Sequence, residues 1–187
     1  HMSSKQSYHP GRYVNAEPEI SKHTIAALVE DVEGITSRVT GMFTRRGYNL
    51  SSFVSAETGR PGIQRFTLVV EADERTIEQI MKQLHKLVPV LKVAELEEES
   101  MVARALMLVK VSANAANRPQ IVDAVNIFRG RVVDVAPDSI VIEATGSPGK
   151  LQALLDVVEP FGILELARSG HVALSRGAKV MAPKYSA

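Results

Sequence analysis

The chain has 187 residues, of which 45% are hydrophobic and 23% charged, and its formal net charge is +1. These values are typical of a globular protein with one large or two small domains, and they argue against a strong field for nucleic acid or membranes. The chain has no cysteine, which excludes disulfides, thiolate catalysis and thiolate metal sites. The absence of cysteine also fits a reducing compartment. No apolar run reaches the roughly 18 residues of a membrane span, and no signal peptide is visible.

The two ends of the chain are predicted to be tails. Residues 1–21 show no apolar periodicity and contain Pro10, Gly11 and Pro18, and His1-Met2 resembles the remnant of a removed tag. We predict a disordered tail over residues 1–21 and a second flexible tail over residues 179–187.

Residues 22–98 carry the pattern of a first domain. Residues 23–30 are apolar on both faces, as in a strand at the centre of a sheet. A helix is predicted over residues 35–46, and Gly47 is its natural C-terminal cap. The apolar face of this helix is formed by Ile35, Val39, Met42 and Phe43.

Two strands, a second helix and a last strand follow. Residues 48–57 and 63–72 predict strands on either side of the turn sequence TGRPG. The second helix is predicted from its apolar residues, which are Ile77, Ile80, Met81, Leu84 and Leu87. Residues 89–96 complete the order β-α-β-β-α-β, the ferredoxin-like arrangement with both helices on one face of an antiparallel four-stranded sheet.

A second domain is predicted over residues 99–178, after an acidic run (Glu95 and residues 97–99) that we interpret as a solvated linker. Its predicted elements are a strand over 102–113, a helix capped by Asn117, two strands joined at Pro137-Asp138, a helix, and one or two strands over 162–177. The sequences MFTRRGYNL and NIFRGRVVDV are similar, which suggests a duplication. We therefore predict the α+β class with two successive βαββαβ-like domains.

Motifs of catalysis and metal binding are not found in the sequence. None of the five histidines pairs with an acid or another histidine at metal-ligand spacing. The segment GSPGK (146–150) lacks the spacing of a phosphate loop and is interpreted as the start of a helix. Phe53 and Phe66 are interpreted as core residues rather than base-stacking aromatics. We expect no catalytic site, metal site or cofactor on this chain.

A candidate binding site lies in the stretch VEDVEGITSRVTGMFTRRGYNL (residues 29–50), where a helix begins directly after a strand. A helix N-terminus offers unpaired N–H groups and the positive end of the dipole, so it binds carboxylates. Gly34 and Ile35 would point N–H groups outward, and Asp31 would accept from an ammonium group. Asn49 would add an amide, and an apolar rim is predicted from Val29, Ile35 and Leu50.

These residue types describe a site for an α-amino acid with an aliphatic side chain. The alternative is an ordinary strand-to-helix turn, in which Asp31 caps the helix. The residues alone favour neither interpretation.

The sequence resembles a known family over residues 22–177. The segment HTIAALVEDVEGITSRVTGMFTRRGYNLSSF is similar to the ACT domain that opens the small regulatory subunits of acetolactate synthase, also called acetohydroxyacid synthase. The resemblance continues through the segments EQIMKQLHKLVPVLKV, LMLVKVSA, IFRGRVVDV, EATGSPGKL and LARSGHVALSRG.

The resemblance implies a regulatory subunit without an active site. Such a subunit binds and activates a large catalytic subunit that carries thiamine diphosphate, magnesium and FAD. It confers feedback inhibition by valine, or by leucine or isoleucine, on the first common step of branched-chain amino-acid biosynthesis. It also implies a bacterial cytoplasmic protein that forms homodimers through its ACT domains.

In this family the effector lies where two ACT domains meet, and the motif places that role on Asp31, Gly34, Ile35 and Asn49. Relatives often have asparagine where this chain has Asp31. One alternative is a stand-alone amino-acid-sensing ACT regulator that acts on another partner, although no helix is left over for DNA binding. A small enzyme on a ferredoxin-like scaffold would need an acid–base constellation, which the sequence does not show.

Overall fold

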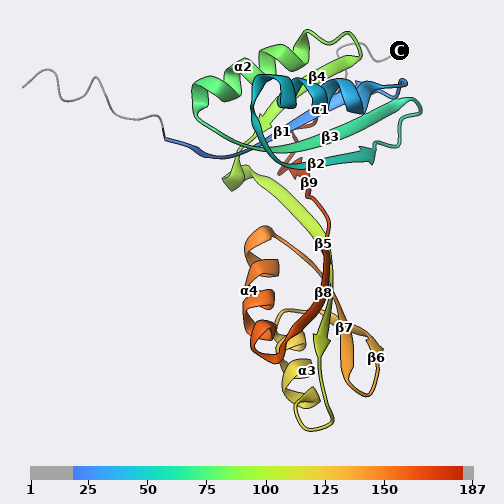
Figure 1. The fold of residues 1–187 in the computed structure, drawn as a ribbon. Coiled ribbons are helices and arrows are strands. Elements are labelled where there is room, and N and C mark those ends of the chain that lie inside the picture. Colours follow the sequence, from blue (N-terminus) through green and yellow to red (C-terminus); the bar gives the residue numbers. More distant parts are fainter. Residues whose placement is uncertain (1–18, 183–187) are drawn as a thin grey trace, which may run out of the picture.

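The computed structural model describes residues 19–182, and Figure 1 shows their arrangement. Of the two predicted tails, residues 1–18 and 183–187 lie outside the described part. Ser21, which we assigned to the N-terminal tail, already belongs to the first strand.

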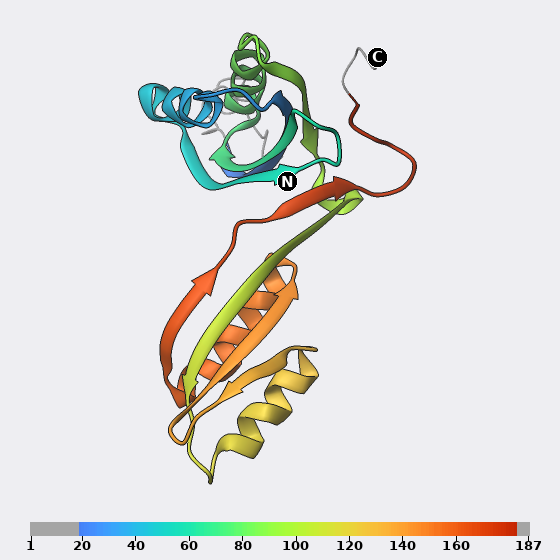
Figure 2. The same cartoon turned by 90° about the vertical axis from the view of Figure 1, so that its right-hand side faces the viewer.

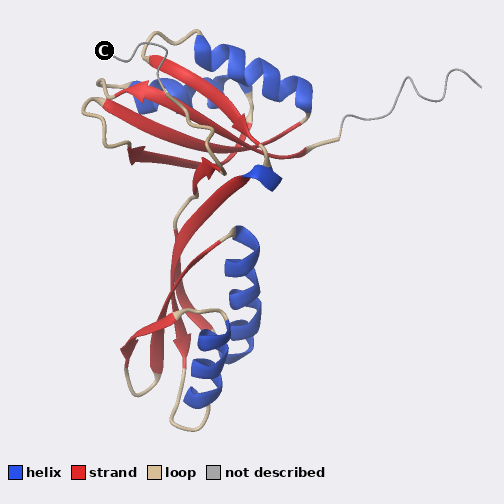
Figure 3. Ribbon diagram, turned by 180° about the vertical axis from the view of Figure 1, so that it is seen from behind, coloured by secondary structure: helices blue, strands red, loops and turns tan. Residues whose placement is uncertain are grey.

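The first sheet has four antiparallel strands in the order β2-β3-β1-β4. Both helices of this part lie on one of its faces (Figures 1 and 3). The predicted ferredoxin-like order is confirmed. The elements are β1 (Ser21–Glu30), α1 (Ile35–Arg46), β2 (Asn49–Glu57), β3 (Ile63–Ala72), α2 (Glu74–His85) and β4 (Val90–Leu96).

The helix ends follow the residues that the sequence provides. Gly47 ends α1 in the left-handed conformation (φ 66°), which a glycine adopts without a steric penalty. The Asp73 carboxylate accepts a hydrogen bond of 2.7 Å from the Thr76 N–H at the start of α2. Hydrogen bonding to Thr76, first through its side chain and then through its N–H, lowers the pKa of Asp73 because it favours the ionised form.

The core of the first domain lies between the helices and one face of the sheet. Alternate residues of β1 point into it, and Phe53 meets Phe66 edge to face with ring centroids 4.8 Å apart. The interpretation of these two phenylalanines as core residues is therefore confirmed. The buried β1, β3 and α1 residues of this core include Ile25, Ala27, Val29, Phe66, Leu68, Val39 and Phe43.

The second sheet repeats this topology. Its main strands have the order β6-β7-β5-β8, which matches β2-β3-β1-β4 when each strand is compared with its counterpart in chain order. The shared topology supports the suggested duplication. The elements are η1 (Glu98–Ser100), β5 (Met101–Ser112), α3 (Arg118–Ile127), β6 (Arg131–Val135), β7 (Ser139–Gly146), α4 (Pro148–Val158), η2 (Glu159–Phe161), β8 (Ile163–Arg168) and β9 (Val172–Ser175).

Three local expectations for this half are settled by the structure. The Ser147 hydroxyl accepts from the Lys150 N–H, so GSPGK is a helix start as predicted. Asn117 occupies the N-cap position of α3, but its side chain accepts from the Asn114 N–H at 2.8 Å and does not cap the helix. Glu95 lies in β4 rather than in the linker, because the apolar pattern of that strand continues through Leu96.

The C-terminal segment forms two strands, and the second of them returns to the first sheet. β8 pairs with the second half of β5, whereas β9 pairs with the first four residues of β5, Met101 to Arg104. Figure 2 shows this ribbon of β5 and β9 leading from the second sheet to the face of the first sheet that carries no helix. The described residues contain no helix of the length and apolar character that crossing a membrane requires.

Truncation of a core residue in α2 should destabilise the first domain. Leu84 is fully buried, so we expect Leu84→Ala to lower the free energy of unfolding by about 2–5 kcal/mol. Val88, three residues beyond the end of α2, is 87% exposed, and Val88→Ala should change the free energy of unfolding by less than about 0.5 kcal/mol. Urea denaturation measures both, and equal losses for the two variants would contradict the packing described here.

Candidate functional site

The turn between β1 and α1 is held in place by two neighbouring loops. The Asp31 N–H donates to the Gly62 carbonyl at 2.9 Å, in the turn between β2 and β3. The Glu30 N–H donates to the Pro89 carbonyl at 2.8 Å, just before β4. Since both bonds come from the main chain, they fix the position of the turn whatever side chains it carries.

The glycine of this turn has a conformation that few other residues adopt. Gly34 has φ 80° and ψ 0°, and the Ile35 N–H donates to the Val32 carbonyl at 3.2 Å. This is a type II turn, because Glu33 has no positive φ. A Cβ placed on Gly34 would have no atom within 4 Å, so the space beside it is open.

Three main-chain donors remain at the mouth of α1. Within residues 19–182, the N–H groups of Gly34, Thr36 and Ser37 donate to no backbone or side-chain acceptor. The predicted donor pair of Gly34 and Ile35 therefore needs a correction, because the Ile35 N–H closes the turn. The donors that can meet an anion are those of Gly34, Thr36 and Ser37, at the positive end of the helix dipole.

The side chains around the turn differ from the predicted arrangement. Asp31 is exposed and forms no side-chain hydrogen bond within the described residues, so it does not cap α1. Val29 and Ile35 are buried in the core and cannot form an apolar rim, because their strand and helix positions face the sheet–helix interface. Val32, which sequence reasoning left out, is 41% exposed and supplies the apolar surface beside Asp31.

Asn49 and Leu50 lie at the other end of the sheet. Asn49 pairs with Glu71, which in turn pairs with Lys22 at the beginning of β1. Eight strand steps separate Lys22 from Glu30, a distance of roughly 26 Å. The Asn49 amide donates to the Glu71 carboxylate at 2.7 Å, and Leu50 packs against the core. One chain therefore does not bring Asn49 and Leu50 to the turn, and their role stays a prediction.

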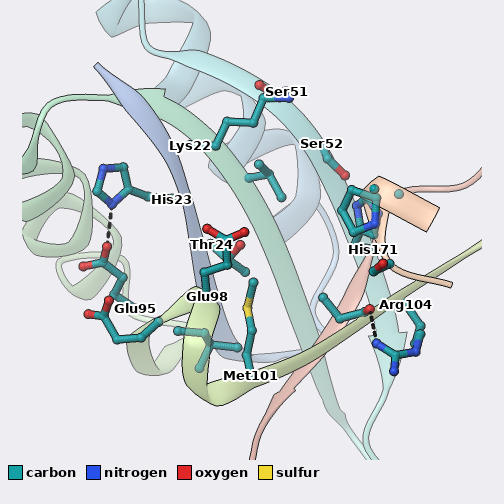
Figure 4. A pocket seen from close by; sticks show the side chains of 18 of the residues that line it. Lys22, His23, Thr24, Ser51, Ser52, Glu95, Glu98, Met101, Arg104 and His171 are labelled. Atoms are coloured by element: carbon teal, nitrogen blue, oxygen red, sulfur yellow. Dashed lines mark hydrogen bonds and ion pairs between the residues drawn. The ribbon is translucent and has the colours of Figure 1, made fainter. Parts of the chain in front are cut away.

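Apart from this turn, the structure has a hollow where the two domains meet (Figure 4). Its volume is about 1370 Å³, and residues of both domains line it, among them Lys22, Ser52, Arg104 and His171. On its wall the His23 imidazole contacts the Glu95 carboxylate at 2.6 Å. We had found no acid partner for His23, because the two residues are 72 positions apart and meet only through the pairing of β1 with β4.

His171 lines this hollow and has a shifted pKa. Burial lowers its pKa below the ordinary value of 6.5, and the charges of Arg168 and Lys22 lower it further. Its Nε2 atom is buried and has no hydrogen-bond partner in the described part of the chain. Between residues 19 and 182, no three histidine or acidic side chains lie together as metal ligands would.

Protonation of His171 at low pH should lower the free energy of unfolding of the protein. The folded state disfavours its protonated form, so its contribution to stability is complete above pH 6.5 and is lost as the pH falls through the lower folded-state pKa. We expect His171→Gln to reduce the loss of unfolding free energy between about pH 7.5 and about pH 5.5. Denaturation at the two pH values measures this difference, and an unchanged pH dependence would contradict the assignment.

Comparison with known proteins identifies first the class of domain and then the family. Residues 25–92 match the model of the ACT domain found in small subunits of acetohydroxyacid synthase and related proteins. This match assigns the first sheet, with its two helices on one face, to the ACT domains. Residues 104–177 match the model described as the small subunit of acetolactate synthase.

Similar proteins support both assignments. The acetolactate synthase small subunit of Mycobacterium bovis is 50% identical over 155 residues, which is 83% of this chain and 92% of that protein. A protein of Methanothermobacter thermautotrophicus named probable acetolactate synthase small subunit is 47% identical over 166 residues, or 88% of this chain and 99% of that one. The crystal structure of the acetolactate synthase small subunit from Thermotoga maritima matches with a TM-score of 0.80 and 36% identity, covering 86% of this chain and all of that one. The chain belongs to the family of acetolactate synthase small subunits.

Proposed function

We propose that this chain binds and activates the catalytic subunit of acetolactate synthase and makes it sensitive to feedback by valine, or by leucine or isoleucine. The observation that carries the proposal is the turn at Gly34 in a chain of this family, with three N–H donors that have no acceptor among residues 19–182. In this proposal thiamine diphosphate, magnesium and FAD are bound by the catalytic subunit, and this chain holds none of them.

The turn offers each contact that an aliphatic amino acid requires. The ligand carboxylate accepts from the N–H groups of Gly34, Thr36 and Ser37. The Asp31 carboxylate accepts from the ligand ammonium group, and the exposed Val32 contacts the aliphatic side chain. The open space at Gly34 lets the ligand approach the main chain closely.

A second chain can complete this site if two first sheets join along their β2 edges. β2 is an outer strand of the sheet, and Figure 2 shows that α1 lies at the same edge of the domain as β2. If the two-fold axis passes at Phe53, the middle residue of β2, Asn49 of one chain lies level with Glu57 of the other. Glu57 pairs with Gln64, and Gln64 pairs with Val29, two residues before Asp31. The homodimer therefore brings Asn49 of one chain to the turn of its partner.

The ligand acts on the catalytic subunit through a difference in affinity between two states of the complex. Valine bound between two chains contacts both of them, so it biases their relative orientation. The coupling free energy is of the usual order of about 1–3 kcal/mol. By linkage, the catalytic subunit changes the affinity for valine by the same factor.

A mixing assay tests the proposal itself. When this protein is added to the catalytic subunit from the same organism, acetolactate formation should rise, and valine should reverse the increase. A matched measurement without the small subunit should show little effect of valine. If addition of the chain changes neither rate nor valine response, an ACT regulator that acts on another partner becomes the better interpretation.

A negative charge introduced at position 34 should abolish valine sensitivity. Gly34→Asp places an anion where the ligand carboxylate lies, and we expect valine binding to weaken by at least about tenfold, or about 1.4 kcal/mol, while activation persists. Gly34→Asn is the matched control, because both residues tolerate the left-handed backbone better than other side chains. Calorimetric titration compares them. Equal loss for both variants would attribute the effect to backbone strain rather than charge.

The two-chain site predicts complementation between variants. In a heterodimer of Gly34→Asp and Asn49→Ala chains, one site joins the intact Gly34 of one chain to the intact Asn49 of the other, while the second site carries both changes. Purified heterodimers should therefore bind about one valine at wild-type affinity, although each homodimer binds weakly. If the heterodimer binds as weakly as the homodimers, Asn49 does not act across the chains.

A further inference from the structure

The last strand of the second domain is seated on the uncovered face of the ACT sheet. β9 lies there with Ala173, which is 3% exposed, in contact with the fully buried Ala26 and with Leu96. Met101 and Ala103, from the paired part of β5, pack against the same cluster. Met181 packs against it as well, so the cluster combines three alanines with Leu96 and two methionines.

The side chain of Arg65 in β3 forms a hydrogen bond to the main chain of β9. Its Nη2 atom donates to the Ala173 carbonyl at 2.9 Å, across 108 residues of sequence. Its Nε atom is buried and has no hydrogen-bond partner among the described residues, and this burial lowers the pKa of Arg65. A guanidinium in this position retains its charge, so loss of the bond would leave a partly desolvated cation.

Gly170, just before β9, is required for space rather than for conformation. It has no positive φ, yet a Cβ on it would lie 2.5 Å from Ser52 Oγ and 2.5 Å from Val54 Cγ2. The serine hydroxyl can rotate away, whereas the branched side chain of Val54 is restricted at χ1. The sheet and the segment before β9 are therefore in direct contact over β2 as well as over β3.

The loop that leads into β3 also holds the turn at Gly34, which we call the effector turn. Gly62, whose carbonyl accepts from the Asp31 N–H, lies three residues before Arg65. Arg65 pairs across the sheet with Leu28 of β1, which leads directly into the turn. A displacement of the turn on ligand binding therefore acts on the same short stretch of β1 and β3 to which β9 is bonded.

We propose that this seat is the joint through which the effector turn controls the position of the second domain. We define the β9 seat as Ala26, Ser52, Val54, Arg65 and Leu96 together with Gly170 and Ala173, which contact them. The inference rests on the proposed function, since it supplies the route from the valine site to the second domain. The physical device is a strand that belongs to one domain and is anchored by hydrogen bonding and close packing on the other.

The first measurement compares coupling in the full-length protein with its catalytic subunit. The ratio of valine dissociation constants with and without saturating catalytic subunit should fall below about twofold in Arg65→Met and in Gly170→Ala, from a wild-type value of about 5–150-fold. Valine affinity of the free small subunit should stay within about twofold of wild type. Arg75→Met, an exposed arginine in α2, is the matched control and should keep the wild-type ratio.

A second substitution separates a lost joint from misfolding. Val54→Ala removes one of the two atoms that a Cβ at position 170 would meet, and the Ser52 hydroxyl can rotate away. The double variant Gly170→Ala, Val54→Ala should therefore recover most of the wild-type ratio. Val54→Ala alone should keep the ratio near wild type. Persistence of the full ratio in both Arg65→Met and Gly170→Ala would overturn the proposal.

A distance measurement tests the joint without valine. The chain has no cysteine, so Val88→Cys and Ile127→Cys, at positions 87% and 78% exposed in the two domains, give unique labelling sites. Pulsed spin-label spectroscopy, with labelled chains diluted in unlabelled ones, should show a broader inter-domain distance distribution in Gly170→Ala than in wild type. If the inter-domain distance distribution of Gly170→Ala is as narrow as that of wild type, the proposal that the β9 seat holds the two domains together is wrong. A broadened width in a protein that does not respond to valine would instead contradict the proposed function and retain the joint.

Discussion

The left-handed backbone of Gly34 is the constraint on which the site depends. It closes a type II turn on the Val32 carbonyl, and α1 begins immediately afterwards. A side-chain cap would satisfy the next donors, but a glycine at the N-cap supplies none, so the N–H groups of Gly34, Thr36 and Ser37 stay free within the described residues. The same turn is bonded to the loops before β3 and before β4, and these bonds fix the position of the donors that we propose for the ligand carboxylate.

The repeated topology underlies the proposed combination of effector sensing with transmission in one chain. Each half has a sheet of the same strand order, with helices on one face, so each half leaves one sheet face without a helix. In the first half that face receives β9, a strand paired with β5 of the second half. The two domains are thus joined through a sheet face and a hydrogen-bonded ribbon rather than through a flexible linker alone. Such a contact can carry a change in orientation from one domain to the other.

Much of the fold could be predicted from the sequence because it follows local periodicity. Alternation, helical spacing and turn residues located the strands and helices of both halves and the turn at Gly34, and the resemblance to small subunits favoured an effector site at this turn. The burial of Val29 could also have been predicted, because Val29 lies an even number of residues after Ile25 on β1 and therefore faces the core. We misassigned it by treating the end of the strand as part of the site.

Other features depend on strand register, which a single sequence does not reveal. The separation of Asn49 from Asp31 follows from the pairing of β2 with β3 and of β3 with β1. The contact of His23 with Glu95 and the bond from Arg65 to Ala173 likewise join residues distant in the chain. Gly170 carries no local signal either, since it is required by the proximity of Val54 and not by its own backbone angles.

The crystal structure of the protein grown with valine tests the central claim most directly. The account predicts a ligand carboxylate oxygen about 2.7–3.2 Å from main-chain nitrogens at Gly34, Thr36 or Ser37, with Asn49 of a second chain beside it. A valine bound elsewhere, or a dimer that fills the space beside Gly34 with its own side chains, would contradict it.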